Sequence, residues 1–132
     1  MLADVPDVIE KQHHEALRKA GIVNSQQLYE RIVTRRARRS LATTSAVPVR
    51  VLARWSRLLD LMQLSGIGPK MVRLMNAAGI NTLKGLQGAQ ADTLWSAMRV
   101  ANRGGRYSEV VPSADVLRGW IGNAQKRAVR LE

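Results

Sequence analysis

Apolar and charged residues follow each other along residues 49–62 with the period of an amphipathic helix. Arg50, Arg54 and Arg57 are spaced by four and three residues, so they share one face of such a helix. The apolar residues fall on the opposite face: Val51, Leu52, Trp55, Leu58, Leu59 and Met62. The pattern predicts a helix with a buried apolar side and a basic side exposed to solvent.

Capping and breaking residues predict further helices. One begins near Pro69, which suits a first helical position, and ends at Ala78-Gly79, because Gly closes a helix in the left-handed conformation at little cost. Three more are predicted: after Asn81-Thr82, over residues 91–103, and from a cap at Ser113 and Asp115 to about Ala128. No segment has the sustained alternation of a strand, so we predict an all-α fold.

Two segments of the chain resemble two earlier ones. Residues 17–22 resemble residues 75–80 at an offset of 58, and residues 51–55 resemble residues 116–120 at an offset of 65. A longer loop around residues 102–110 would absorb the difference between the offsets. We therefore predict two tandem repeats, residues 1–62 and 63–132, packed as one compact domain. Chance similarity in a chain rich in Ala and Leu is the alternative.

A Gly-Ile-Gly-Pro turn precedes the predicted helix at Pro69. Its two glycines would let the backbone come close to a ligand, and the free amides of the next helix would point toward it. Such a site can hold one nucleic-acid phosphate without contacting the bases. The candidate contact residues are Gly66, Ile67, Gly68, Lys70 and Arg73. A purely structural turn is the alternative.

These residues also carry a resemblance. The Leu-x-Gly-Ile-Gly-Pro-Lys segment at 64–70 resembles the helix-hairpin-helix element of DNA-repair and RNA-associated proteins. Residues 77–83 and 111–121 resemble the uncharacterised domain-of-unknown-function family 4332, and the resemblance is strongest over residues 58–125. It implies tandem helix-hairpin-helix units without an established activity, with Gly66 and Gly68 as the hairpin glycines and Lys70 as the phosphate-side cation.

The first repeat departs from this pattern. It has Val8-Ile9-Glu10-Lys11 where the second has Gly66-Ile67-Gly68-Pro69, so both glycines are missing and an acid replaces one of them. A pair of hairpins that grip opposite strands of a duplex is therefore in doubt.

The positive charge is concentrated in one stretch. The chain has a formal net charge of +11, and residues 31–57 contain eight Arg and no Asp or Glu. Guanidinium groups suit phosphates, so this stretch favours a polyanionic partner, whereas the alternative is a basic face that serves solubility. We take the following as further contact candidates: Arg35, Arg36, Arg38, Arg39, Arg50, Arg54 and Arg57.

Residues 39–55 also resemble a helix-turn-helix. Leu41 and Ala42 would pack inside, Val47 would lie at the turn, and Val51 and Leu52 would anchor the second helix. The arginines of that helix would face a major groove or its phosphates. Any short helix pair with a Val-Pro entry has a similar pattern, and a shared packing role for the two repeats is the alternative.

Other residue types give little sign of chemistry. There is no Cys, and the adjacent His13 and His14 have no further His or Cys to complete a metal site, so we expect no metal, no cofactor and no enzyme. Trp55, Trp95 and Trp120 are expected in the core. No apolar stretch is long enough to cross a membrane, and the first ten residues are acidic, unlike a signal peptide, so we expect a cytoplasmic protein.

The sequence thus predicts a small non-enzymatic module that binds nucleic acid mainly through phosphates. The alternative is a protein-interaction or scaffold module of the same fold that docks an acidic protein partner and uses the hairpin only as a turn. The oligomeric state and the choice between DNA and RNA are left open.

Overall fold

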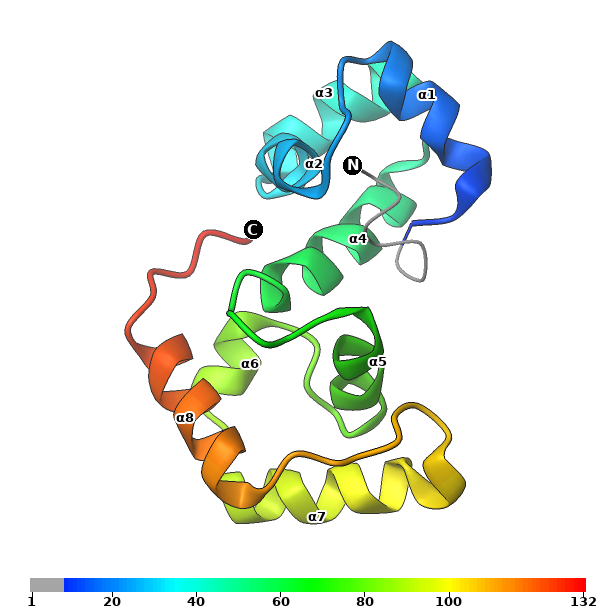
Figure 1. Ribbon diagram of the computed structural model, residues 1–132. Coiled ribbons are helices and arrows are strands. Elements are labelled where there is room, and N and C mark those ends of the chain that lie inside the picture. Colours follow the sequence, from blue (N-terminus) through cyan, green and yellow to red (C-terminus); the bar gives the residue numbers. More distant parts are fainter. Residues whose placement is uncertain (1–8) are drawn as a thin grey trace. The chain divides into compact units, whose positions relative to one another are not determined.

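The computed structural model describes residues 9–132, and over this range it is helical without any strand (Figure 1). The predicted all-α class is therefore confirmed. Val8, which the predicted repeat places at the position of Gly66, and the acidic residues before it lie outside the described residues. The chain divides into two compact units. Unit 1 comprises the described residues up to Asp60 together with Arg130–Glu132, and unit 2 comprises Leu61–Val129.

Unit 1 contains a 3-10 helix followed by α-helices, the last of which ends one residue into unit 2: η2 (Lys11–His13), α1 (His14–Lys19), α2 (Ser25–Ile32), α3 (Arg35–Ser45) and α4 (Val49–Leu61). The side chains of Asn24 and Thr34 accept hydrogen bonds from backbone N–H groups and cap α2 and α3. Helix α3 packs against α1 and α2. Fully buried side chains form the core: Leu17, Ile22, Leu28, Ile32, Leu41, Leu52 and Trp55.

Unit 2 has four α-helices and one 3-10 helix: α5 (Pro69–Ala77), α6 (Leu83–Gln87), α7 (Ala91–Ala101), η3 (Arg103–Gly105) and α8 (Ala114–Gln125). Side chains of Thr82 and Ser113 cap α6 and α8 as the sequence predicts. Helix α8 packs against α6 and α7, and α5 packs against α7. The buried side chains include Val72, Leu74, Met75, Leu83, Leu86, Leu94, Met98 and Leu117.

The same helix-closing turn occurs once in each unit. After α1, Gly21 has a φ of 86° and the N–H of Ile22 donates to the Leu17 carbonyl. After α5, Gly79 has a φ of 100° and the N–H of Ile80 donates to the Met75 carbonyl, 58 residues later. A duplicated unit would have this geometry, and the duplication itself stays a prediction.

The long connection that the sequence predicts near residues 102–110 separates α7 from α8, and the buried side chain of Asn102 organises it. Its amide oxygen accepts from the N–H groups of Tyr107 and Ser108 at 2.9 and 3.0 Å, and its amide nitrogen donates to the Ser108 carbonyl at 2.9 Å. In unit 1, residues 46–48 alone connect α3 to α4.

The structure differs from the predicted boundaries at the end of the chain. Helix α8 ends at Gln125, not near Ala128, and Arg130–Glu132 group with unit 1 instead of the second repeat. The cause is a set of polar contacts within unit 1. Arg130 donates to both carboxylate oxygens of Glu30 at 2.9 and 2.7 Å, and the N–H of Glu132 donates to the Val33 carbonyl at 2.9 Å.

Candidate nucleic-acid interface

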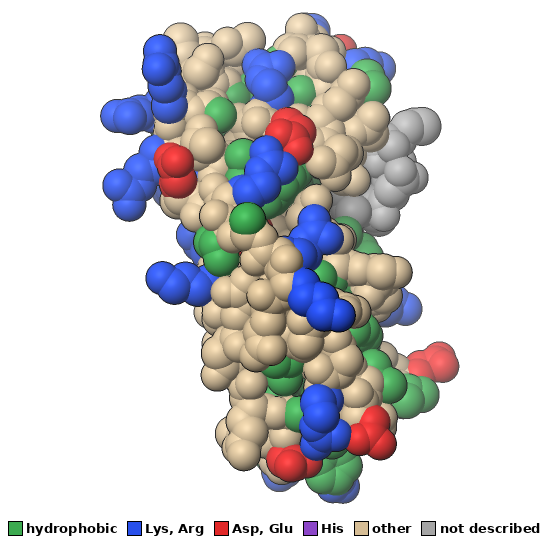
Figure 2. All heavy atoms as spheres, turned by 90° about the vertical axis from the view of Figure 1, so that its left-hand side faces the viewer, with side chains coloured by type: hydrophobic (Ala, Val, Ile, Leu, Met, Phe, Trp, Pro, Cys, Tyr) green, Lys and Arg blue, Asp and Glu red, His purple; other side chains and the backbone are tan. Residues whose placement is uncertain are grey.

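Most of the arginines predicted to contact phosphate are exposed on α3 and α4. Arg50, Arg54 and Arg57 are exposed on the side of α4 away from the fully buried Leu52 and Trp55. Arg35, Arg36 and Arg39 are exposed on α3. Figure 2 shows Lys and Arg side chains projecting at many points of the face that it presents, with Asp and Glu beside some of them. Both basic helices therefore offer cations to an external partner.

Arg38 is not one of these exposed cations, although the sequence predicts it as a phosphate contact. Its exposed fraction is 5%, and its guanidinium donates to the backbone carbonyls of Ile32 at 2.7 Å and Glu132 at 2.5 Å. Burial, together with the charge of Arg35, lowers the pKa of the Arg38 guanidinium below its ordinary value. Arg38 therefore joins α3 to two backbone segments, and no face of it is left for a phosphate.

Residues 31–57 contain no acid, but acidic residues from other parts of the chain contact two of their arginines. The carboxylate of Glu10 accepts hydrogen bonds from the Arg54 guanidinium and from the Trp55 indole, and a Glu132 carboxylate oxygen accepts from the backbone N–H of Arg35 at 3.2 Å. Sequence reasoning missed both carboxylates because Glu10 and Glu132 lie far along the chain from their partners. Of the exposed arginines on α3 and α4, four make no hydrogen bond or ion pair with an acidic side chain among residues 9–132, through either the backbone or the guanidinium: Arg36, Arg39, Arg50 and Arg57.

The hairpin residues of unit 2 include an exposed cation beside an uncapped helix start. Gly68 is the N-cap of α5 and has no side chain to accept a hydrogen bond, and Pro69 follows it as predicted. The N–H groups of the first helical turn have no acceptor within their own helix. Lys70 and Arg73 are exposed on this helix. The start of α5 therefore has an exposed cation close to N–H groups that no side chain of the N-cap residue accepts from.

Two of the predicted hairpin contacts have structural roles. The side chain of Ile67 is 4% exposed and its N–H donates to the Leu64 carbonyl at 3.3 Å, so neither group faces a ligand. Gly66 has a φ of 91°, and a Cβ built there would lie 3.3 Å from the Trp120 indole nitrogen. Gly66 is thus required by its backbone conformation and by the closeness of an indole ring, whatever the hairpin binds.

Helices α3 and α4 have the packing that the helix-turn-helix interpretation requires. Leu41, Val47 and Leu52 are buried, and Ala42 and Val51 are half-buried. Packing of this kind serves any short helix pair, so it does not test base recognition. Trp55 is fully buried as expected, whereas Trp95 and Trp120 are half-buried, and the Arg99 guanidinium lies 4.7 Å from the Trp95 ring centroid.

Unit 1 also contains a buried tyrosine–aspartate pair, which is not on the exposed sides of α3 and α4. The Tyr29 hydroxyl donates to a carboxylate oxygen of Asp60 at 3.0 Å, and Asp60 is 1% exposed. Burial, and then the charge of Asp60, raises the pKa of Tyr29 to about 12. This pair ties α2 to α4 and has no group open to a substrate.

Within residues 9–132, no group of three or more His, Cys, Asp or Glu side chains is arranged to hold a metal ion. No helix in the range combines the length and the apolar character that crossing a bilayer requires.

Comparison with known proteins gives one result. No curated protein and no solved structure matches the chain. The family model described as "Domain of unknown function (DUF4332)" matches residues 7–127, which is nearly the whole chain and agrees with the resemblance seen in the sequence. The chain therefore belongs to this domain-of-unknown-function family.

Proposed function

We propose that this chain is a non-enzymatic module that binds nucleic acid through backbone phosphates, largely independently of base sequence. The observation that carries the proposal is the set of exposed arginines on α3 and α4 that have no acidic partner among residues 9–132, namely Arg36, Arg39, Arg50 and Arg57. A guanidinium binds a phosphate through two parallel hydrogen bonds, and each phosphate neutralised releases condensed counterions. A net charge of +11 adds long-range attraction for a polyanion.

The hairpin of unit 2 would supply a separate phosphate contact. Lys70 is exposed beside the uncapped start of α5, where free N–H groups and the helix dipole both favour an anion. A Cβ on Gly68 would meet no atom within 4 Å, so the backbone there is open to close approach by a ligand. In this proposal the buried side chains of Ile67 and Arg38 are not contacts, and Gly66 shapes the turn.

The first test compares two variants with the same net charge. One replaces the four unpaired arginines of α3 and α4 by Gln, and the control replaces four other exposed arginines, Arg99, Arg103, Arg106 and Arg127. Binding of a fluorescent mixed-sequence DNA duplex and of a matching RNA is measured by anisotropy at several salt concentrations. We expect the slope of log affinity against log salt to flatten by about 3–4 in the first variant if each arginine contacts one phosphate. Equal losses in both variants would contradict a localised site.

The second test concerns the hairpin alone. Lys70→Gln should weaken binding and reduce the salt slope by about 1, whereas Lys84→Gln, the same change on α6, should have a smaller effect. Gly68→Ala should weaken binding without loss of stability, because its methyl group would occupy the open space beside α5. Normal binding by both Lys70→Gln and Gly68→Ala would leave the hairpin as a structural turn.

A module that docks an acidic protein is the second candidate function. Two contacts in unit 1 favour this candidate, because its own carboxylates already bind to the basic helices. Glu10 accepts a hydrogen bond from Arg54, and Glu132 accepts one from the backbone N–H of Arg35. A saturable protein partner that remains bound after nuclease treatment, together with no nucleic-acid binding at low salt, would support this candidate over the first. A cytoplasmic location stays a prediction for either function.

A further inference from the structure

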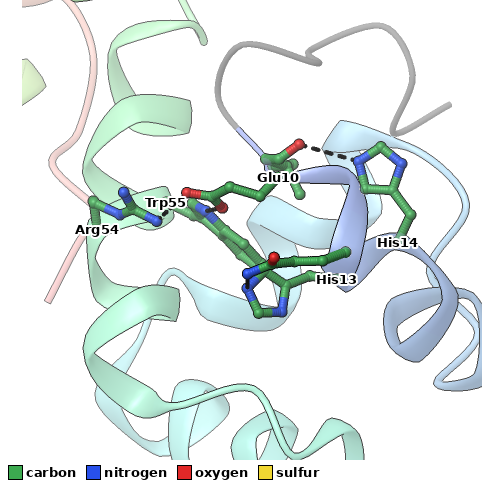
Figure 3. Close-up of polar contacts among 7 residues, drawn as sticks. Glu10, His13, His14, Arg54 and Trp55 are labelled. Carbon is green, nitrogen blue, oxygen red and sulfur yellow. Dashed lines mark hydrogen bonds and ion pairs between the residues drawn. The ribbon is translucent and has the colours of Figure 1, made fainter.

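The carboxylate of Glu10 is held by two donors from α4. The Arg54 guanidinium donates to one carboxylate oxygen, and the indole nitrogen of Trp55 donates to the other at 3.1 Å (Figure 3). Trp55 is fully buried, and the His13 ring packs edge-on against it with the ring centroids 5.3 Å apart. Burial alone would raise the pKa of Glu10, but a backbone hydrogen bond, Arg54 and the indole together lower it. Glu10 is therefore a bound, ionised group.

Glu10 corresponds to Gly68 of the hairpin when the two units are compared. Each residue immediately precedes a helix, η2 for Glu10 and α5 for Gly68, and they are 58 positions apart, the same offset that relates the turns at Gly21 and Gly79. In each unit, an indole of the last helix faces this entry segment. Trp55 donates to Glu10, and the Trp120 indole nitrogen lies against Gly66. Unit 1 thus has an acid where unit 2 has a glycine.

The donors around Glu10 are those that a phosphate would use. A guanidinium and an N–H group both form short, strong hydrogen bonds with an oxyanion, and a carboxylate and a phosphate present similar oxygens to them. We propose that Glu10 is an internal substitute for a phosphate: it occupies an oxyanion site formed by Arg54 and Trp55 and keeps that site closed to nucleic acid. This inference rests on the proposed function, and it names Glu10 as the residue that limits phosphate binding by unit 1.

The inference explains two observations together. Arg54 belongs to the exposed arginine row of α4, and its side chain is 51% exposed. Within the part of the chain that the structure describes, it is paired with an acid, whereas Arg50 and Arg57 are not. The first repeat also lacks the hairpin glycines. An internal carboxylate makes a close backbone approach to a phosphate unnecessary there, so the glycines are not needed. Unit 1 would then meet nucleic acid through its free arginines alone.

The first experiment removes the internal anion and measures nucleic-acid binding. Glu10→Gln keeps an oxygen for the Trp55 indole and removes the negative charge. Glu15→Gln is the control, because Glu15 is an exposed acid of the same unit whose ion pair within residues 9–132 is with Arg18. We expect Glu10→Gln to bind the duplex more tightly than the control and to steepen the salt slope by about 0.9, so that the gain shrinks about threefold between 50 and 200 mM salt. In an Arg54→Gln background the gain should disappear. An equal gain in the control, or a gain that persists without Arg54, would overturn the inference.

A second experiment needs no nucleic acid and therefore separates this inference from the proposed function. Glu10→Ala vacates the site, and inorganic phosphate is added while the unfolding temperature is measured. Phosphate should stabilise Glu10→Ala more than it stabilises Glu15→Ala, and the additional Arg54→Gln change should abolish the difference. The absence of preferential stabilisation would overturn the inference even if the wild-type chain binds nucleic acid. Preferential stabilisation with no binding of DNA or RNA would instead reject the proposed function and keep an internal anion site.

Discussion

The two glycines of the Gly-Ile-Gly-Pro turn should respond in opposite ways to the same substitution. Gly66 has a φ of 91°, a conformation that side-chain-bearing residues rarely adopt. Gly68 is extended, with a φ of −98° and a ψ of −175°, which any residue can adopt. A methyl group on Gly66 would lie 3.3 Å from the Trp120 indole nitrogen, whereas one on Gly68 would meet nothing within 4 Å. Only Gly66→Ala is therefore expected to destabilise the native structure.

The expected free energies follow from these two environments. An Ala forced into the left-handed region costs roughly 1–2 kcal/mol, and displacing the indole by a few tenths of an ångström adds to this, so Gly66→Ala should destabilise unit 2 by about 1–3 kcal/mol. Gly68→Ala should be neutral or should stabilise it by about 0.4–1 kcal/mol, because Ala restricts the unfolded chain.

The measurement is urea unfolding of both variants, followed by far-ultraviolet circular dichroism and tryptophan fluorescence. Thermal unfolding gives a second readout, since 1 kcal/mol shifts the midpoint of a domain of 60–100 residues by roughly 4–8 °C. A Gly66→Ala variant as stable as the wild type would refute the assigned backbone conformation and indole contact. A Gly68→Ala variant destabilised by more than about 1 kcal/mol would show that its surroundings are not open.

Three further predictions concern unit 1. Arg38→Ala should lower the free energy of unfolding by about 1.5–3 kcal/mol, because buried carbonyls lose a charged donor. Arg39→Ala, on the exposed side of α3, should change it by less than about 0.5 kcal/mol in the same denaturation assay. The ultraviolet absorbance change that accompanies ionisation of the Tyr29 hydroxyl should occur near pH 12, and Tyr29→Phe should abolish it. Because the folded pKa of Tyr29 is raised above its ordinary value of 10.0, its contribution to stability is full below pH 10 and is lost as the pH rises toward 12. The ion pair of Glu10 with Arg54 should contribute about 0.2–1 kcal/mol to the free energy of unfolding, because the pair is half-exposed. Since the pKa of Glu10 is lowered in the folded state, this contribution is present above the ordinary pKa of 4.5 and is lost as the pH falls through the lowered value. The stability difference between wild type and Glu10→Gln should therefore be larger at pH 7 than at pH 3.

The helices could be predicted from the sequence because local residues determine them. The apolar stripe at 49–62 corresponds to α4 at Val49–Leu61, and Pro69, Thr82 and Ser113 mark helix starts as expected. Caps and prolines act within one turn of their own position, so no tertiary information is needed to interpret them. The end of α8 at Gln125 was predicted less well, since Arg127 and Ala128 offer no strong stop signal.

The candidate site could be predicted only in part. The exposed faces of α3 and α4 follow from helical spacing, and so does the exposure of Lys70. Arg38 lies three residues before Leu41 and so shares its buried face, but spacing does not reveal what pairs its charge there, because its acceptors include the backbone of Glu132 at the other end of the chain. The pairing of Arg54 was also missed, although one signal was present: in the repeat alignment Glu10 stands at the position of Gly68, just before a helix.

The sequence by itself thus determined the helical class, most helix starts, the basic side of α4 and the Gly-Ile-Gly-Pro turn, because these depend on residue types at short spacing. Tertiary structure decided which cations are free. Glu10 reaches Arg54, Glu132 reaches the start of α3, and Arg38 turns inward. The physical reason is that a charged side chain is buried or paired only where distant segments supply its hydrogen-bond partners, and local spacing carries no information about those segments.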